Sequence, residues 1–372
     1  MWIDLGVPWG CTKEQDMEIL MGKARTFFWV SFLLALASGA NPDSTSMAGH
    51  ELRTRALGVM APLEPAQDLG RKPLEEQRAA LGRLLFFEPR VSLDGTVSCS
   101  RCHLPQLYGT DGLPRSVGVM GRLNPRNAPT VLNAFLQISQ HWRGDRESLE
   151  DQAVKALVGA PSFGNPSLEA AMARLRAIEG YHELFKKAFP QDQDPINAKN
   201  WGVAIGVFER TLVSPSRLDE WLLGSETALN AREKRGLERF LDLGCIDCHG
   251  GPGLGGSMYE KFGIHMNYWE ATGSIEPERG RADVTGDLQD LYVFKVPSLR
   301  NVAVTPPYFH DGSVPELERA VKIMGSTQLG RQLQEDVIKD LSEFLKALTG
   351  TVPKSLAEAP LLPQAGFTGM AR

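Results

Sequence analysis

Helical periodicity marks the two stretches of the chain that lead into the pentapeptides at 99–103 and 245–249. Apolar side chains there recur on one face of a 3.6-residue period, which predicts an amphipathic helix in front of each pentapeptide. The apolar positions are Leu74, Leu81, Leu84 and Leu85 in the first stretch and Leu237, Phe240 and Leu241 in the second. Asn230 and Glu233 have the spacing of a capping box at the start of the second helix. The repeated order of helix and pentapeptide indicates an internal duplication.

Two further helices are predicted at 167–178 and 333–348. The second of these is followed by Gly350 and Pro353, which end helices. Its apolar positions are Leu333, Val337, Leu341, Phe344, Leu345 and Leu348. Long stretches rich in Gly and Pro separate the elements at 109–130, 250–257 and 272–287. Almost no segment alternates as a strand does, so the expected fold class is mainly α with long loops and little or no sheet.

Both pentapeptides, CSRCH and CIDCH, follow the pattern C-x-x-C-H. This pattern attaches c-type haem, because its two thiols form thioethers to the haem and the adjacent imidazole binds the iron. A zinc site would need four ligands from two paired half-sites, and a redox disulfide would not need the His. Two copies therefore favour two covalently bound haem c groups over zinc or a disulfide. The residues that would hold them are Cys99, Cys102 and His103 in the first copy and Cys245, Cys248 and His249 in the second.

Composition adds two limits to this interpretation. The chain has 372 residues, of which 42% are hydrophobic, and a formal net charge of −5. That length can fill two cores, and the mild acidity argues against a nucleic-acid partner. Four of the five Cys lie in the pentapeptides, so Cys11 has no partner for a further structural disulfide.

The N-terminal region has the pattern of a targeting segment. Met21 begins a second possible N-terminus, in which the basic residues Lys23 and Arg25 precede an apolar run at 27–37 and a group of small residues. This order is typical of a secretory signal peptide, although an amphipathic helix or an uncleaved membrane anchor would also fit. Residues 1–40 are interpreted as an over-extended start plus a signal peptide, which predicts a periplasmic protein.

Longer phrases then occur in a distinctive order between residues 70 and 350. They are RNAPTVLNAF at 126–135, HWRGDRESLEDQA at 141–153, GRADVTGD at 280–287, FKVPSLRNVAVTPPYFHDGS at 294–313 and AVKIMGSTQLG at 320–330. With the two pentapeptides, they resemble the bacterial di-haem cytochrome c peroxidases, whose relatives include protein-oxidising enzymes of the methylamine-utilisation type. The resemblance implies two cytochrome c-like haem domains, at 41–215 and 216–350, and a flexible tail at 351–372.

The resemblance also implies a different task for each haem. The N-terminal haem, with His103 as proximal ligand, would react with peroxide. The C-terminal haem would receive electrons through an iron bound by His249 and Met324, a ligand pair that raises its potential. The protein-oxidising relatives use a Tyr instead of this Met, in a segment worded differently. Trp142 matches a Trp between the haems, and Gln152 matches a distal Gln that can hydrogen-bond peroxide.

A calcium ion between the domains is implied as well. Its ligands would be the Asn127 side chain and the backbone carbonyls of Thr305 and Pro307, neutral oxygens that suit calcium but bind it weakly. His310 matches a His near the C-terminal haem and is expected to contact a propionate or a polar network, not the iron. The implied partners are hydrogen peroxide and a small soluble electron donor, either a cytochrome c or a cupredoxin. Family members often form homodimers.

Two positions depart from the family pattern. Many members carry an inhibitory distal His 16 residues after the proximal His, where this chain has Val119. Valine cannot bind iron, so the N-terminal haem is expected to be open without reductive activation unless Met120 turns in as a ligand. The family's distal Glu, which moves a proton during peroxide cleavage, is also missing. Ser162 or Phe163 takes its place, and Glu169 follows in the next predicted helix.

These observations favour a periplasmic cytochrome-c peroxidase that reduces hydrogen peroxide to water, with lower activity if no carboxylate reaches the distal pocket. Two alternatives stay open. A relative that oxidises proteins or small molecules is favoured by the open haem and opposed by Met324. A non-catalytic di-haem electron carrier or redox sensor is favoured by the missing Glu.

Overall fold

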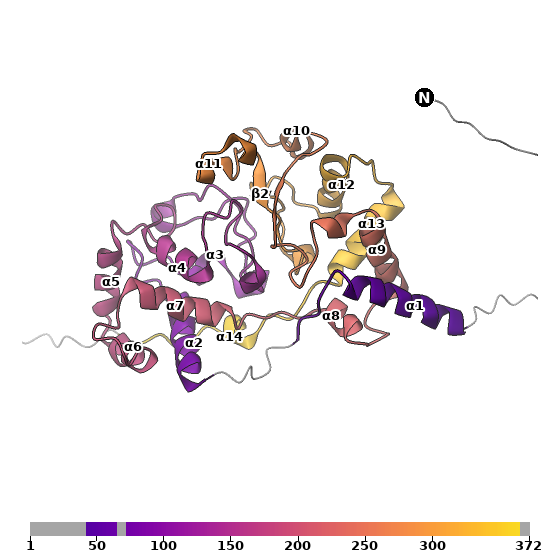
Figure 1. Ribbon diagram of the computed structural model, residues 1–372. Helices are drawn as coiled ribbons and strands as arrows, with labels where there is room; N and C mark the ends of the chain where they lie inside the picture. Colours follow the sequence, from indigo (N-terminus) through magenta and orange to yellow (C-terminus); the bar gives the residue numbers. More distant parts are fainter. Residues whose placement is uncertain (1–41, 65–71, 365–372) are drawn as a thin grey trace, which may run out of the picture. The chain divides into compact units, whose positions relative to one another are not determined.

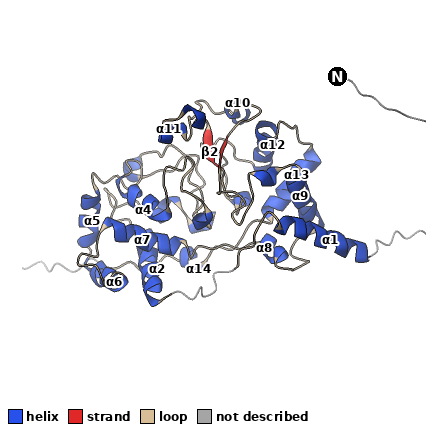
Figure 2. Cartoon of the chain, in the orientation of Figure 1, coloured by secondary structure: helices blue, strands red, loops and turns tan. Residues whose placement is uncertain are grey.

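The computed structural model describes residues 42–64 and 72–364, so the signal peptide predicted at 1–40 lies outside the described residues. The described part is mainly helical, as predicted, and contains one two-stranded sheet (Figure 2). The antiparallel strands are β1 (Tyr259–Lys261) and β2 (Val293–Lys295). The α-helices are α1 (Pro42–Leu57), α2 (Pro73–Phe86), α3 (Cys99–Cys102), α4 (Leu149–Val158), α5 (Leu168–Arg176), α6 (His182–Ala188), α7 (Ala198–Glu209), α8 (Arg217–Leu222), α9 (Ala231–Asp242), α10 (Tyr268–Thr272), α11 (Ala282–Thr285), α12 (Leu317–Gln328), α13 (Glu335–Lys346) and α14 (Lys354–Ala357).

The helix before the first pentapeptide, α2, packs against α7 (Figure 1). Pro73 opens α2 at a position where its missing N–H costs nothing. Gly82 lies against the backbone of Ala204 on α7, and a side chain there would collide with the Ala204 carbonyl. This glycine therefore lets the two helices approach closely. The surrounding core is formed by apolar residues of α2, α4, α5, α6 and α7, among them Leu81, Leu85, Leu157, Phe185 and Trp201.

The helix before the second pentapeptide, α9, repeats this arrangement against α13. Asn230 and Glu233 form the predicted capping box. Gly236 lies against the backbone carbonyl of Asp340 on α13, again with no room for a side chain. In each half of the sequence, the helix before the pentapeptide thus crosses a later helix at a glycine, which supports the interpretation as a duplication.

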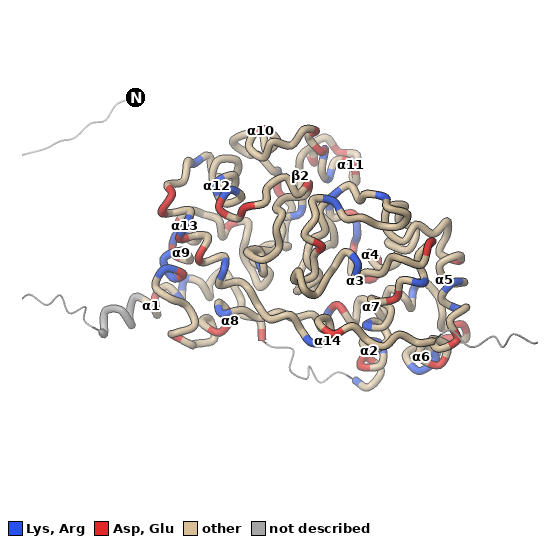
Figure 3. Tube along the Cα trace, turned by 180° about the vertical axis from the view of Figure 1, so that it is seen from behind, with Lys and Arg blue, Asp and Glu red and all other residues tan. Residues whose placement is uncertain are grey.

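Positions of basic and acidic residues lie close together on α9 and α13 (Figure 3), and ion pairs join the two helices. Nitrogen atoms of Arg232, Arg235 and Arg239 lie 2.9, 3.6 and 3.2 Å from carboxylate oxygens of Asp340. Asp340 is itself buried. Three arginines around one buried carboxylate satisfy a charge that would otherwise be costly to remove from water.

The other predicted helices are found with short boundary differences. The helix expected at 167–178 is α5, capped by Ser167, and the helix expected at 333–348 is α13. The segment at 351–364 differs from the flexible tail expected over 351–372, because it contains α14 and Leu356 is fully buried. A single apolar residue gives no helical or strand periodicity in the sequence, so the burial of Leu356 could not be predicted. Residues 365–372 lie outside the described part of the chain.

The predicted boundary between domains at 215 and 216 stays a prediction. Ala56 and Met60, expected in the N-terminal domain, belong to the apolar core that residues 218–348 form. Within residues 42–64 and 72–364, no helix combines the length and apolar character needed to cross a membrane.

Candidate functional site

The first pentapeptide forms one turn of helix, α3, directly before its His. The His103 N–H donates to the Cys99 carbonyl at 3.0 Å, and the backbone then leaves the helix. The His103 Nδ1 lies 2.9 Å from the carbonyl oxygen of Gly109. Burial lowers the pKa of His103, although the carbonyls of Gly109 and Pro129 act in the opposite sense. A neutral ring that donates through Nδ1 keeps the Nε2 lone pair for a metal.

The second pentapeptide has a similar local geometry. Residues Cys245–Asp247 form a 3-10 turn, and the His249 N–H donates to the Cys245 carbonyl at 3.0 Å. Burial lowers the pKa of His249 to about 4. The His249 ring is therefore neutral at physiological pH, and its buried Nδ1 has no hydrogen-bond partner among the described residues. A neutral imidazole is the form that binds iron.

A cavity of about 280 Å³ brings together residues that are far apart in the sequence. Cys245, Cys248 and His249 line it, together with Met324 from α12. Trp142 and the backbone around Pro129 also border this space. The structure thus places the predicted axial pair, an imidazole and a thioether, on the walls of one cavity.

The donor set of these pentapeptides fits haem better than the alternatives. All four thiols are free, so neither pentapeptide closes a disulfide. Burial raises the pKa of Cys245 to about 11, which keeps that thiol protonated at neutral pH. Residues 42–64 and 72–364 contain no cluster of three or more His, Cys, Asp or Glu side chains that could hold a metal ion. A zinc site would therefore lack ligands, whereas paired thiols beside a neutral imidazole meet the needs of haem attachment.

Trp142 lies in the loop that runs from the first half of the chain towards α4. Its Nε1–H donates to the Asn127 carbonyl at 3.0 Å, and its ring meets the edge of His310 at a centroid distance of 6.4 Å. The same cavity extends to Pro129 and Thr130. Because the Pro129 carbonyl lies beside the His103 ring, the cavity wall reaches from the second pentapeptide to the surroundings of His103. The place of Trp142 between the two haems stays a prediction.

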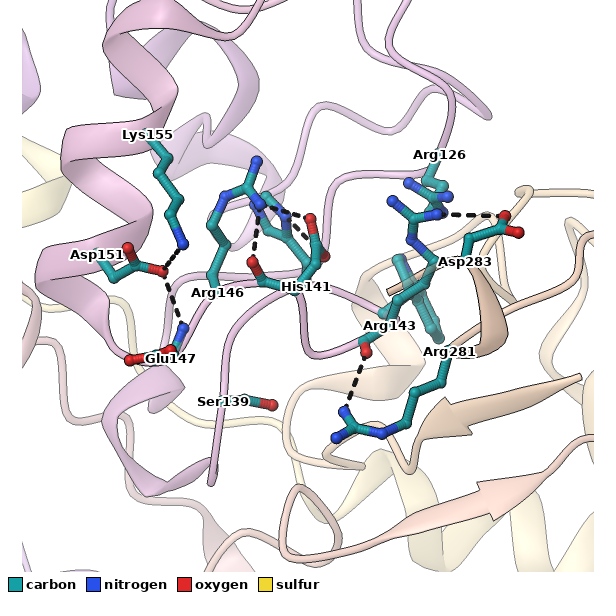
Figure 4. A network of polar contacts seen from close by, with 12 residues as sticks. Arg126, Ser139, His141, Arg143, Arg146, Glu147, Asp151, Lys155, Arg281 and Asp283 are labelled. Carbon is teal, nitrogen blue, oxygen red and sulfur yellow. Dashed lines mark hydrogen bonds and ion pairs between the residues drawn. The ribbon is translucent and has the colours of Figure 1, made fainter. Parts of the chain in front are cut away.

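Ion pairs hold this loop in place (Figure 4). Arg143 lies 3.4 Å from Asp283, and Arg281 donates to the Arg143 carbonyl at 3.5 Å. His141, which precedes Trp142, lies 3.4 Å from Asp145, which follows it. Burial alone would raise the pKa of Asp145, but His141 and nearby arginines lower it. The Asp145 carboxylate is consequently charged and accepts a hydrogen bond from Arg146 at 2.6 Å. These contacts fix the backbone on both sides of Trp142.

Comparison with known proteins decides the family. A family model described as di-haem cytochrome c peroxidase matches residues 76–227. The chain is 41% identical over 310 residues to a cytochrome c551 peroxidase of Nitrosomonas europaea, covering 83% of this chain and 90% of that protein. It is 39% identical over 330 residues to a cytochrome c551 peroxidase of Pseudomonas aeruginosa, covering 88% of this chain and 93% of that protein.

The chain belongs to the di-haem cytochrome c peroxidase family. A solved structure of a MauG-like protein associated with microbial copper homeostasis is 31% identical, with a TM-score of 0.69 over 80% of this chain and 95% of that chain. Membership confirms the predicted resemblance and implies two haem c groups and peroxidase activity.

The sequence left open which of Val119 and Met120 faces the predicted N-terminal haem. Val119 is fully buried, and its N–H donates to the Ser162 carbonyl at 3.1 Å. The Met120 side chain is 64% exposed, and its N–H donates to Asp94 at 2.8 Å. With φ of 55° at Met120, the backbone turns so that Val119 lies inside and Met120 outside. The Val119 side chain therefore faces the core, and the Met120 side chain faces solvent. The open N-terminal haem stays a prediction.

The residues predicted to replace the family's distal Glu carry no carboxylate, and the nearby Glu169 is exposed. Phe163 is buried against Trp201, with ring centroids 6.1 Å apart. Ser162 is half-buried, and Glu169 is exposed in the first turn of α5. Gln152 is half-buried on α4.

The residues predicted to bind calcium all border the cavity. The Asn127 Nδ2 donates to the Leu113 carbonyl at 2.9 Å, and the Thr305 hydroxyl donates to the Asn301 carbonyl at 3.2 Å. Asn127 also donates its N–H to the His310 carbonyl at 2.9 Å, so it joins the Trp142 region to the segment that carries Thr305 and Pro307. The calcium site stays a prediction.

Sequence reasoning missed the charged residues Glu260, Lys295 and Arg300 of the cavity wall, of which Lys295 has no acidic partner among the described residues. Lys295 is 5% exposed and borders the cavity of the second pentapeptide. The only sequence signal for the burial of Lys295 is that both of its neighbours in the chain, Phe294 and Val296, are apolar. A lysine next to apolar residues is normally exposed, so this signal was too weak to predict its burial.

Proposed function

We propose that this chain is a periplasmic peroxidase that reduces hydrogen peroxide to two molecules of water, using two electrons from a small soluble cytochrome c or cupredoxin and two protons. The observation that carries the proposal is the cavity that joins the walls of the second haem site to Trp142 and to Pro129 beside His103. When bound, the haems supply one-electron redox chemistry and an iron site for peroxide. An electron accepted at the second site would then have a short aromatic route to the first.

In this proposal, each residue of the two haem sites has a separate role. His249 and Met324 hold the electron-entry site, and Trp142 bridges towards His103. The Gln152 amide can hydrogen-bond peroxide on the distal side. Because Val119 is buried and Met120 is exposed, the N-terminal site is proposed to be open without reductive activation.

The proposal also includes features outside the haem sites. Export to the periplasm depends on residues 1–40, and a homodimer is proposed from family behaviour. A calcium ion held by Asn127, Thr305 and Pro307 would tie the Trp142 region to the second half of the chain.

A non-catalytic electron carrier or redox sensor is the second candidate. It is favoured by the burial of Phe163 and the exposure of Glu169, which leave no carboxylate at the position where the family has its acid. Loss of general acid–base help typically slows a reaction by about 10²–10⁴-fold.

The test uses the oxidised di-haem protein. Its electron paramagnetic resonance and optical spectra are recorded before and after peroxide is added without pre-reduction, and turnover is then followed with a reduced cytochrome c. A high-spin ferric signal that peroxide consumes, with donor oxidation, supports the proposal. Two low-spin haems that ignore peroxide even after partial reduction would favour the carrier.

Replacing Trp142 by phenylalanine is expected to slow electron transfer between the haems while both stay bound. The variant loses the Nε1–H bond to the Asn127 carbonyl, which should also lower the free energy of unfolding by about 1 kcal/mol. Stopped-flow reduction measures the transfer, and the Trp269→Phe variant, in the aromatic cluster beyond His310, is the control. Equal transfer rates in the Trp142→Phe variant and the wild type would rule out the bridging task.

A further inference from the structure

Lys295 has an unusual environment for a lysine. It is the last residue of β2, where its N–H donates to the Trp142 carbonyl at 2.8 Å. Its side chain is 5% exposed and borders the cavity that Cys245, Cys248 and His249 line. The ammonium group is thus out of bulk water and next to a haem-binding space.

No protein carboxylate balances this charge. Among the described residues, the ammonium forms one hydrogen bond, to the side-chain oxygen of Gln137, and no Asp or Glu acts on its pKa. Glu260 also borders the cavity, but its carboxylate accepts a hydrogen bond from the Lys261 N–H and forms no ion pair with Lys295. A buried cation with only a neutral partner costs several kcal/mol. Burial accordingly lowers the pKa of Lys295 to about 8.

The other buried cation of the cavity wall is already neutralised. Both terminal nitrogens of Arg300 bind Asp219, at 2.8 and 2.9 Å. Lys295 is therefore the buried cation of this wall, within residues 42–64 and 72–364, that still lacks an anion. Haem carries two propionate carboxylates, which are anions of the required kind.

We propose that Lys295 is the counter-cation of a propionate of the C-terminal haem and raises the reduction potential of that haem. The C-terminal haem is favoured because its Cys245, Cys248 and His249 line the cavity. The corresponding residues of the first pentapeptide do not line it. A fixed positive charge stabilises the reduced haem, which carries one electron more. The inference depends on haem attachment at the second pentapeptide and not on peroxide turnover.

The experiment measures the potential of each haem in the holoprotein by spectroelectrochemical titration. Three variants are compared with the wild type: Lys295→Met, Lys295→Arg and, as a control on the paired strand β1, the exposed Lys261→Met. In Lys295→Met the one-electron equilibrium for reducing the C-terminal haem is expected to fall about tenfold, which is about 59 mV. Lys295→Arg should keep most of the wild-type potential, and Lys261→Met should leave it unchanged.

Three results would overturn the proposal. The first is an unchanged C-terminal potential in a folded, fully loaded Lys295→Met variant. The second is a shift confined to the N-terminal haem, which would assign the lysine to the other propionates. The third is an equal shift in Lys261→Met, which would show a general surface-charge effect. If Lys295→Met does not fold, Lys295→Gln, which keeps a hydrogen-bonding partner for Gln137, must show the same drop.

The result is independent of the proposed peroxidase reaction. A protein that shows the Lys295 shift but no peroxide turnover would refute the reaction and keep the inference. A protein that turns over peroxide but shows no change of potential in Lys295→Met would support the reaction and refute the inference.

Discussion

Replacing Met324 by histidine is expected to keep the C-terminal haem low-spin but to lower its reduction potential by about 120 mV or more, a hundredfold change in the one-electron equilibrium. The reason is that imidazole stabilises oxidised iron more than a thioether does. Met324 projects from α12 into the same cavity as His249, so a histidine there can reach the ligand position. Donor-dependent turnover should fall with the potential, because electron entry becomes unfavourable.

Spectroelectrochemistry and the low-spin optical bands check this prediction. The Met266→His variant makes the same chemical change at a partly exposed position and should leave both haems unaltered. Met324→Leu offers no sixth ligand and should give a high-spin C-terminal haem. If Met324→His has the optical and redox properties of the wild type, Met324 is not a ligand.

Replacing Asp219 by alanine is expected to lower the free energy of unfolding by about 3–5 kcal/mol, because it leaves the Arg300 guanidinium buried and unpaired. Both side chains are 1% exposed. Asp219 also accepts the Leu63 N–H at 2.7 Å and forms a capping box with Ser216 at the start of α8. Chemical denaturation of the haem-loaded protein measures the loss.

Asp194→Ala is the matched control for this variant. Asp194 is 69% exposed and pairs with Arg176 on the surface, a kind of ion pair that contributes about 0–1 kcal/mol. Equal effects of the two substitutions would mean that the buried pair adds nothing beyond a surface contact.

The same pair predicts an acid dependence of stability. Burial alone would raise the pKa of Asp219, but the hydrogen bonds and charge of Arg300 lower it below its ordinary value. The folded pKa is thus below the unfolded pKa of about 3.9, so the stabilisation is complete above that pH and is lost as the pH falls through the folded pKa. The Asp219→Ala variant should lose this part of the acid sensitivity, which denaturation curves between neutral and acid pH can measure.

The sequence predicted α2, α5, α9 and α13 because their signals are local, but it did not predict helices such as α7 and α12. The capping box of Asn230 and Glu233 and the apolar face of α13 depend only on neighbouring residues. The pentapeptides were equally clear, because the chemistry of haem attachment needs those residue types at that spacing. That Met324 borders the cavity of His249 was predicted only through resemblance, since nothing local distinguishes a ligand Met from a core Met.

Other features depend on distant packing and could not be predicted from the sequence. Val119 and Met120 are adjacent apolar residues, and the choice of which one turns inward depends on the left-handed backbone at Met120 and its bond to Asp94. Lys295 is buried because the loop that carries Gln137 and Trp142 covers it. The inward orientation of Val119 and the burial of Lys295 both depend on contacts with segments that are distant in the sequence.

The burial of Leu356 has a consequence for the order of events during synthesis. This residue is packed with Phe86, Leu132 and Phe208 in a core whose other fully buried members all precede residue 213. Arg83 donates hydrogen bonds to the carbonyl oxygens of Ser355 and Glu358, which holds the segment in place. A ribosome reaches Leu356 only after it has translated both pentapeptides. The first half of the protein therefore cannot complete its core as the chain emerges, and its last step of folding waits for a residue made after the whole second half.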